Sequence, residues 1–180
     1  MANLKGKVII VTGAAMGLGL SAAEVLASKG ADLTLVDYND EALNKTKEEL
    51  ASKFPERKFL TVAADVSVEE NVKNYVDQTV KEFGKVDGLY NNAGIEGKQA
   101  PLVDYDIDIF KKVIDINLLG VYYGMKYVIP EFQKNGGGKI VNVASVGGIR
   151  GVLNQTAYVA TKHAVAGMTK NAALEYGKDN

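Results

Sequence analysis

Residues 7–19 read KVIIVTGAAMGLG, and this stretch decides the fold class. Its first half, Lys7–Thr12, is a continuous apolar run, which is typical of a strand covered on both faces of a parallel sheet. Glycines then allow a tight turn and a close approach of the backbone to a ligand. A helix that starts after such a turn presents its positive end to a phosphate. The stretch predicts a nucleotide-binding turn, with a ligand-free turn as the alternative.

Short apolar runs alternate with longer helical patterns along the rest of the chain. Further strands are predicted at 32–37, 58–63, 86–90 and 139–144, and helices at 17–29, 40–53, 108–132 and 156–176. Another helix is predicted after Ser67, where Glu70 completes a capping box. This alternation implies right-handed crossovers and a parallel sheet. The predicted fold class is therefore α/β, a Rossmann-like doubly wound sheet in three α/β/α layers, with ligands beyond the carboxyl ends of the strands.

The composition excludes several classes of function. The 180 residues include no cysteine, so disulfides, thiolate metal sites and redox dithiols are excluded. A net charge of −1 gives no basic surface for nucleic acid or an anionic membrane. No signal peptide is evident, and no apolar run approaches the ~20 residues of a membrane span. We expect a single cytoplasmic domain over residues 1–180, without metal, nucleic-acid or membrane partners.

The end of the second predicted strand bears on the choice of cofactor. A carboxylate at Asp37 can accept hydrogen bonds from the adenosine ribose hydroxyls, and it would repel a 2′-phosphate. Met16 and Tyr38, where a basic residue could hold that phosphate, are uncharged. These residues favour NAD over NADP, although Asp37 alternatively only begins a turn. After the third strand, Asp65 and Val66 either flank an adenine or help to end the strand.

A second group of residues is suited to proton transfer. Tyr158 and Lys162 lie four residues apart, and therefore on one face of the last predicted helix. A tyrosine with an ordinary pKa of about 10 is a poor base, but an ammonium held nearby favours the phenolate. Ser145, at the end of the fifth predicted strand, could donate a hydrogen bond to a substrate oxygen. Such a tyrosine–lysine pair also occurs on many solvated helix faces, so its weight comes from the accompanying motifs.

Taken together, the motifs resemble those of the short-chain dehydrogenase/reductase family. They occur in the family's order: TGxxxGxG at 12–19, NNAG at 91–94, Asn117, Ser145, and YxxxK at 158–162. The resemblance covers essentially the whole chain. Tyr90 replaces the aliphatic residue that is usual before Asn91, which is a small departure.

The resemblance implies a role for each matching residue. Tyr158 would be the general acid/base as hydride moves to or from nicotinamide, with Lys162 assisting it and binding the nicotinamide ribose. Ser145 would polarise the substrate oxygen, and Asn117 would hold a water in a proton relay. The implied cofactor contacts are Gly13, Ala15, Met16, Gly17, Leu18, Gly19, Asp37, Tyr38, Asp65, Val66, Asn91, Ala93, Gly94, Tyr158 and Lys162.

The resemblance also implies an activity and an assembly. We expect an NAD-dependent oxidoreductase acting on a small alcohol or ketone, in a homodimer or homotetramer built through helices 108–132 and 156–176. Family members continue into two more strands and a substrate-covering loop, so we expect a domain truncated before its last two strands. The fifth strand would then be an exposed sheet edge. A catalytically silent dinucleotide-binding fragment is the alternative function.

Two other signals are set aside. Asp104, Asp106 and Asp108 alternate as in a calcium loop, but the required glycine is absent, and a solvated helix entrance is the simpler interpretation. His163 is the only histidine in the sequence, and it could pair with Ser145 in a hydrolase. Ser145 lacks the first glycine of a nucleophile elbow, so the hydrolase is a remote third hypothesis.

Overall fold

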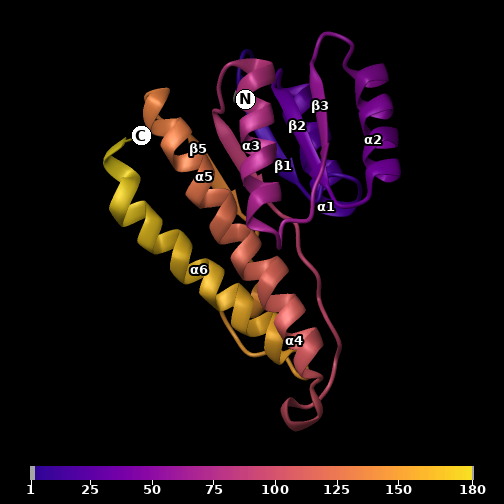
Figure 1. The fold of residues 1–180 in the computed structure, drawn as a ribbon, viewed down its shortest axis with the longest axis vertical. Helices are drawn as coiled ribbons and strands as arrows, with labels where there is room; N and C mark the ends of the chain where they lie inside the picture. The colour runs from indigo at the N-terminus through magenta and orange to yellow at the C-terminus, as the bar shows by residue number, and fades with distance from the viewer. Residues whose placement is uncertain (1–2, 180) are drawn as a thin grey trace.

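A parallel sheet of five strands forms the centre of the fold, as predicted (Figure 1). The computed structural model describes residues 3–179. The strands are β1 (Val8–Thr12), β2 (Asp32–Asp37), β3 (Phe59–Ala63), β4 (Gly88–Asn91) and β5 (Lys139–Asn142). Their order in the sheet is β3-β2-β1-β4-β5, and every neighbouring pair is parallel. The chain therefore builds the sheet outward in both directions from β1, which places the switch point between β1 and β4.

Helices cover both faces of this sheet. They are α1 (Gly17–Ser28), α2 (Asp40–Lys53), α3 (Glu69–Phe83), α4 (Ile107–Ile114), α5 (Gly120–Lys134) and α6 (Thr156–Tyr176). Helices α1 and α2 pack on one face, α3 and α5 pack on the other, and α6 lies beside α5 (Figure 1). Within residues 3–179, no helix combines the length and the apolar character that crossing a bilayer requires.

Alternation along the strands divides the core into two layers. In β1, Ile10 packs into the cluster of α3 and α5, whereas Val11 packs into the cluster of α1 and α2. Val36 and Leu35 divide in the same way in β2. Successive side chains of a strand point to opposite faces, so a strand buried on both sides is apolar at nearly every position. The buried exceptions, Thr12 and Thr34, have hydrogen-bond partners. The continuous apolar run at the start of the chain has this physical cause.

The long helix predicted at 108–132 is interrupted. A π-helical turn, η2 (Asp115–Leu119), stands between α4 and α5. The N–H of Gly120 accordingly donates to the carbonyl of Asp115, five residues back. No breaker residue marks this irregularity in advance, because neither glycine nor proline occurs between 115 and 119. Turns of this kind often accompany functional residues, and Asn117 lies at its centre.

The predicted capping box of Ser67 and Glu70 is wrong. Helix α3 begins at Glu69, and its N-cap, Val68, makes no side-chain capping bond. The hydroxyl of Ser67 instead donates to Oδ1 of Asp65 at 2.6 Å. A short polar side chain that bonds to a group in the preceding turn cannot also cap the helix, because the two hydrogen bonds use the same side chain.

The helix entrance at 104–108 is confirmed. Oδ1 of Asp106 accepts the N–H groups of Asp108 and Ile109 at 2.9 and 3.0 Å, which makes Asp106 the N-cap of α4. These backbone donors lower the pKa of the Asp106 carboxyl, because they stabilise its charged form. Asp106 is thus engaged in local capping.

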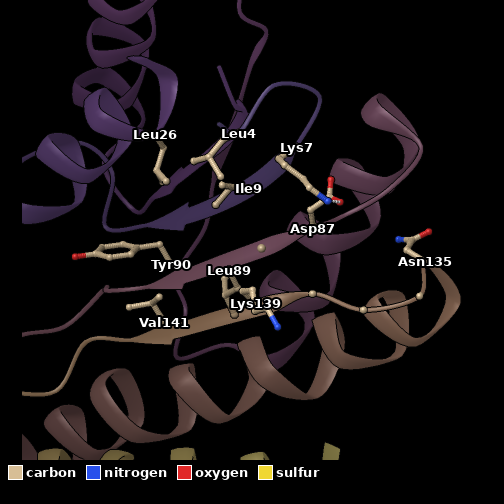
Figure 2. Close-up of a pocket in the computed structure, with 14 residues that line it drawn as sticks. Leu4, Lys7, Ile9, Leu26, Asp87, Leu89, Tyr90, Asn135, Lys139 and Val141 are labelled. Carbon is tan, nitrogen blue, oxygen red and sulfur yellow. Dashed lines mark hydrogen bonds and ion pairs between the residues drawn. The ribbon is translucent and has the colours of Figure 1, made fainter. Parts of the chain in front are cut away.

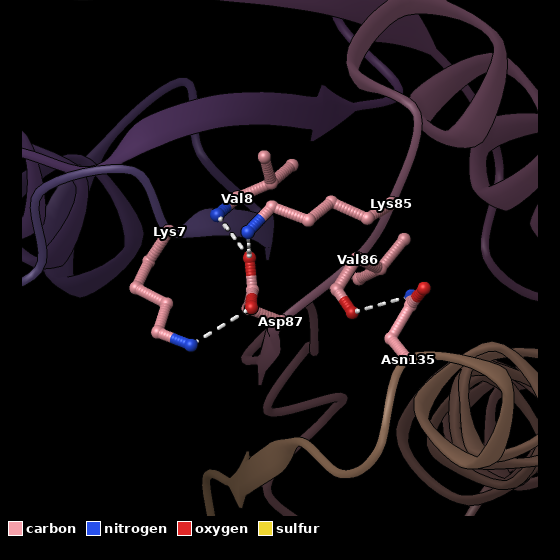
Figure 3. A network of polar contacts seen from close by, with 6 residues as sticks. All are labelled: Lys7, Val8, Lys85, Val86, Asp87 and Asn135. Carbon is pink, nitrogen blue, oxygen red and sulfur yellow. Dashed lines mark hydrogen bonds and ion pairs between the residues drawn. The ribbon is translucent and has the colours of Figure 1, made fainter.

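A half-buried carboxylate joins β1 and β4 at the amino-terminal edge of the sheet (Figure 3). Asp87 accepts from Lys7 Nζ at 3.0 Å, from Lys85 Nζ at 2.9 Å and from the N–H of Val8 at 2.9 Å. Burial alone would raise the pKa of Asp87, but these donors outweigh it and hold the pKa below its ordinary value. The charged carboxylate therefore links the starts of β1 and β4.

The face of the sheet on the α1 side is left open over β4 and β5 (Figure 2). A groove of about 500 Å³ lies there, with Ile9, Leu26, Tyr90 and Val141 among its apolar walls. Val141 is 52% exposed, and β5 is the last strand of the sheet. The expectation of an exposed, apolar edge at the fifth strand is confirmed for residues 3–179.

Among the described residues, Tyr75 of α3 has the one buried side-chain polar atom without a hydrogen-bond partner. Its side chain is fully buried among the residues of the α3–α5 layer, and its hydroxyl has no hydrogen-bond partner within residues 3–179. Burial raises the pKa of this phenol, so the group stays neutral. A buried hydroxyl without a partner loses its hydration and gains nothing in return.

Tyr75→Phe should therefore raise the free energy of unfolding by about 1 kcal/mol, measured by urea denaturation followed by circular dichroism. Tyr127→Phe is the matched control, because the hydroxyl of Tyr127 donates to Glu69 at 2.7 Å and its removal should lower stability. A loss of stability in both variants would contradict the assignment of an unsatisfied hydroxyl to Tyr75.

Candidate active site

The two ends of the glycine-rich turn after β1 pack against each other. A Cβ on Gly19 would lie 2.0 Å from the carbonyl oxygen of Gly13, so the first turn of α1 packs directly on backbone. Gly13 and Gly17 have φ angles of +66° and +56°, which favour glycine. The turn predicted from the sequence is thus both conformationally special and closely packed.

Thr12 and Asn92 connect this turn to the loop after β4. Thr12 Oγ1 accepts the N–H groups of Asn92 and Ala93 at 2.9 and 3.0 Å. The Asn92 amide donates back to the carbonyl of Thr12 at 2.9 Å. The prediction did not include these two side chains among the site residues. Their positions at the ends of neighbouring strands were the signal that could have found them.

The start of α1 has free backbone donors. Its N-cap, Met16, makes no side-chain capping bond, and its first turn contains no acidic residue. Asn39 and Asp106, in contrast, cap α2 and α4 with their side chains. Uncapped N–H groups at a helix N-terminus bind anions, so this end suits a diphosphate. Met16 and Leu18 are both exposed beside it.

Asp37 is fixed next to the turn. Its Oδ2 accepts the N–H of Ala15 at 3.1 Å, and its Oδ1 accepts the N–H of Asn39 at 3.1 Å. An ionised carboxylate has about four acceptor positions, so both oxygens can still accept hydroxyl groups. Tyr38 beside it is 81% exposed and uncharged. The turn, the uncapped helix and this carboxylate fit a dinucleotide.

Asp65 and Val66 are engaged in local structure. Asp65 Oδ1 accepts from both the N–H and the hydroxyl of Ser67, at 2.9 and 2.6 Å, and so forms a turn at the end of β3. The Val66 side chain is buried where a Cβ on Gly120 would collide with it. Asp65 therefore does help to end the strand, as the alternative interpretation held. A contact of Asp65 and Val66 with adenine stays a prediction.

The NNAG segment supports the strands from within. The buried amide of Asn91 donates to the carbonyl of Val121 at 3.0 Å and to Oδ1 of Asn142 at 3.2 Å. It thus links β4 to α5 and β5. Gly94 lies beside Asn117, whose Oδ1 would be 3.2 Å from a Cβ there. The contacts of Asn91, Ala93 and Gly94 with a cofactor stay predictions.

Asn117 holds the loop after β4. Its side chain is fully buried; Oδ1 accepts the N–H of Ile95 at 2.8 Å, and Nδ2 donates to the carbonyl of Ile95 at 2.7 Å. This double contact immobilises the backbone of the loop one residue beyond the NNAG segment. The predicted water-holding role of Asn117 stays a prediction, and its side chain has this structural task in any case.

Lys162 is buried beside Tyr158 in the first half of α6. Its Nζ donates to the carbonyl of Val143 at 2.7 Å and lies 5.6 Å from the centre of the Tyr158 ring. Burial lowers the pKa of Lys162, because the charged form is disfavoured away from water. The tyrosine–lysine pair is thus not on a solvated helix face, which was the alternative interpretation.

Ser145 is placed against the same helix. Its Oγ accepts the N–H of Gly147 at 3.2 Å, and its own hydrogen has no acceptor within residues 3–179. A Cβ on Gly147 would lie 3.5 Å from the Tyr158 ring, so the turn after Ser145 packs on that ring. Ser145 and Tyr158 are both half-buried, and neither hydroxyl donates a hydrogen bond within residues 3–179.

The site as a whole lies at the carboxyl ends of β1, β4 and β5, where a doubly wound sheet binds its ligands. His163 is not part of it. The histidine is exposed, and its Nδ1 lies 3.0 Å from the carbonyl of Val159 on its own helix. No contact joins His163 to Ser145 in the described part of the chain, so nothing supports the hydrolase hypothesis.

Known proteins share this sequence and this arrangement. The family model described as short chain dehydrogenase matches residues 7–180. Levodione reductase of Leifsonia aquatica is 46% identical over 172 residues, which cover 96% of this chain and 64% of that protein. Cyclohexanol dehydrogenase of Acinetobacter sp. (strain SE19) is 40% identical, with 97% and 68% covered. The crystal structure of an NAD⁺-bound xylitol dehydrogenase superposes with a TM-score of 0.96 at 38% identity, with 99% and 68% covered. The chain spans about two thirds of the length of these relatives.

Gly19→Ala should destabilise the protein by about 3 kcal/mol, because its methyl group would have to displace the backbone of Gly13. Gly17→Ala is the control. It has open space around the added Cβ and should lose only about 1 kcal/mol, from its left-handed conformation. Urea denaturation of both variants measures the difference. Equal losses would show that the close approach at Gly19 carries no special weight.

Proposed function

Because this chain belongs to the short-chain dehydrogenase family, we propose that it transfers hydride between NAD(H) and a small alcohol or ketone. The observation that carries the proposal is the buried Lys162 beside Tyr158, next to the free hydroxyl of Ser145. Lys162 Nζ makes one hydrogen bond within residues 3–179, and a buried lysine with so few partners is costly to stability. Such groups are concentrated at functional sites.

The first part of the proposal concerns the cofactor. When bound, nicotinamide accepts or supplies the hydride. The turn at 13–19 and the uncapped start of α1 would bind the diphosphate through backbone N–H groups. Asp37 would accept the ribose hydroxyls and repel a 2′-phosphate, which favours NAD over NADP. The NAD⁺-bound relative supports the same preference.

The second part concerns the proton. In oxidation, the phenolate oxygen of Tyr158 takes the proton of the substrate hydroxyl, and in reduction the phenol returns it. The Ser145 hydroxyl donates a hydrogen bond to the same substrate oxygen and holds it in place. The Lys162 ammonium, fixed by the Val143 carbonyl, stabilises negative charge on the phenol oxygen. Each task falls to a group that the fold leaves free or holds rigidly.

The proposed substrate is neutral. The segment 146–155 adjoins the catalytic helix, and its exposed apolar side chains include Ile149 and Leu153, with Arg150 as its single charge. Such a surface favours an uncharged alcohol or ketone over a polyanion. Two relatives carry names that point to a ring compound, levodione reductase and cyclohexanol dehydrogenase. A cyclic alcohol or ketone is therefore the first class to assay.

We propose in addition that the protein is a homodimer or homotetramer that pairs through α5 and α6. Exposed apolar side chains support this, namely Tyr122 on α5 and Leu174 and Tyr176 on α6. A second candidate function is a dinucleotide-binding unit that has no turnover of its own. The chain's coverage of only about two thirds of its relatives' length favours it.

Tyr158→Phe tests the proposed function. Removing the phenol oxygen should lower kcat for a cyclic alcohol with NAD at least about 100-fold, because the acid/base group is lost. The dissociation constant for NADH should change little, since the backbone turn and Asp37 are untouched. Stopped-flow absorbance and a fluorescence titration measure the two quantities. Undiminished turnover in the variant would contradict the role of Tyr158, and a wild-type chain that binds NADH without turnover would favour the second candidate.

A further inference from the structure

A side-chain contact joins the loop after β4 to the start of α6. Oε1 of Glu96 accepts a hydrogen bond from the side-chain amide of Gln155, the residue immediately before α6 begins at Thr156. Hydrogen bonds to an ionised acceptor are stronger than neutral ones. The carboxylate also stands near a helix N-terminus, where negative charge is favoured. Neither residue belongs to the motifs that indicate the family.

The backbone beside this contact is held as well. The N–H of the buried Ala100 donates to the carbonyl of Asn154 at 3.0 Å. Asn154 has a φ of +61° and is the only non-glycine residue with a positive φ within residues 3–179. Such a conformation persists where the surroundings fix it. The segment that leads into α6 is therefore shaped by the loop after β4.

Neighbouring elements hold that loop at two points. Asn117 holds both backbone groups of Ile95, at 2.8 and 2.7 Å. Gly97 is packed so closely that a Cβ would lie 2.6 Å from Tyr105 Oη and 2.7 Å from Val113 Cγ2. The position of the loop is therefore set by Asn117 in the π-helical turn and by the packing around Gly97. Its contact with the start of α6 is the pair described above.

We propose that Glu96 and Gln155 are positioning residues for Tyr158, which rests on the proposed function. Tyr158 lies three residues after Gln155, close to one helical turn along α6, so a shift of the helix start moves its phenol oxygen. A displacement of ~1 Å can slow a reaction by about 100-fold. The bridge fixes where the phenol stands relative to Ser145 and to the substrate oxygen, and it does so without touching either.

An exchange of partners isolates this role. Gln155→Glu places two carboxylates in contact and breaks the hydrogen bond, because neither ionised group can donate. Adding Glu96→Gln restores an amide–carboxylate pair with the partners reversed and with the wild-type net charge. Glu56→Gln, in the exposed loop before β3, is the control for loss of a surface carboxylate.

Three quantities are measured on each variant: kcat for a cyclic alcohol, the dissociation constant for NADH, and hydrogen exchange at the amide of Val159. That amide donates to the carbonyl of Gln155 at 2.9 Å and reports the first turn of α6. Gln155→Glu should lower kcat roughly 10-fold or more, speed this exchange, and leave NADH binding within about twofold. The double variant should recover kcat to within about threefold of wild type, and Glu56→Gln should match wild type throughout.

Wild-type kcat and exchange in Gln155→Glu would overturn the proposal, as would a double variant that recovers neither. Parallel losses of kcat and NADH binding would also overturn it, because they indicate general disruption of the fold. A wild-type chain without turnover would overturn the proposed function, and the catalytic role of the bridge with it. The exchange rates would then still show whether the bridge holds the start of α6, so the two failures are distinguishable.

Discussion

The hydrogen bonds between Thr12 and Asn92 are the contact on which the site depends. They join the carboxyl ends of β1 and β4 at the switch point of the sheet, where the strand order reverses. The glycine turn leaves from one side of this contact, and the loop that reaches α6 leaves from the other. A shift at this contact would therefore move the proposed cofactor turn and the catalytic helix relative to one another.

Local spacing explains what could be predicted from the sequence. The glycines at 13, 17 and 19 and the pair Tyr158–Lys162 lie within a few residues of each other, so backbone geometry alone places them. The parallel sheet was predictable because strands and helices alternate along the chain and such crossovers are right-handed. The exposed β5 edge was expected from the family resemblance, and the order of the strands was not predicted. The Glu96–Gln155 bridge was not, because it joins residues far apart in the chain.

The two failed details of secondary structure have tertiary or competing causes. Ser67 matched a capping box, but its hydroxyl donates to the Asp65 carboxylate in the preceding turn and does not cap the helix. The π-helical turn carries no breaker residue, and the periodicity of 108–132 gave no sign of it. The buried amide contacts of Asn117 with Ile95 lie in this turn, so a packing requirement accompanies the irregularity. Sequence patterns describe elements well, and they describe contacts between elements poorly.

The central claim is that the turn after β1 binds NAD(H), and a fluorescence titration of the 180-residue chain with NADH and, separately, NADPH tests it most directly. Asp37 beside the uncapped start of α1 predicts saturable binding of NADH, with NADPH at least about 10-fold weaker because its 2′-phosphate meets that carboxylate. Folded protein that binds neither nucleotide, or that prefers NADPH, would contradict the account.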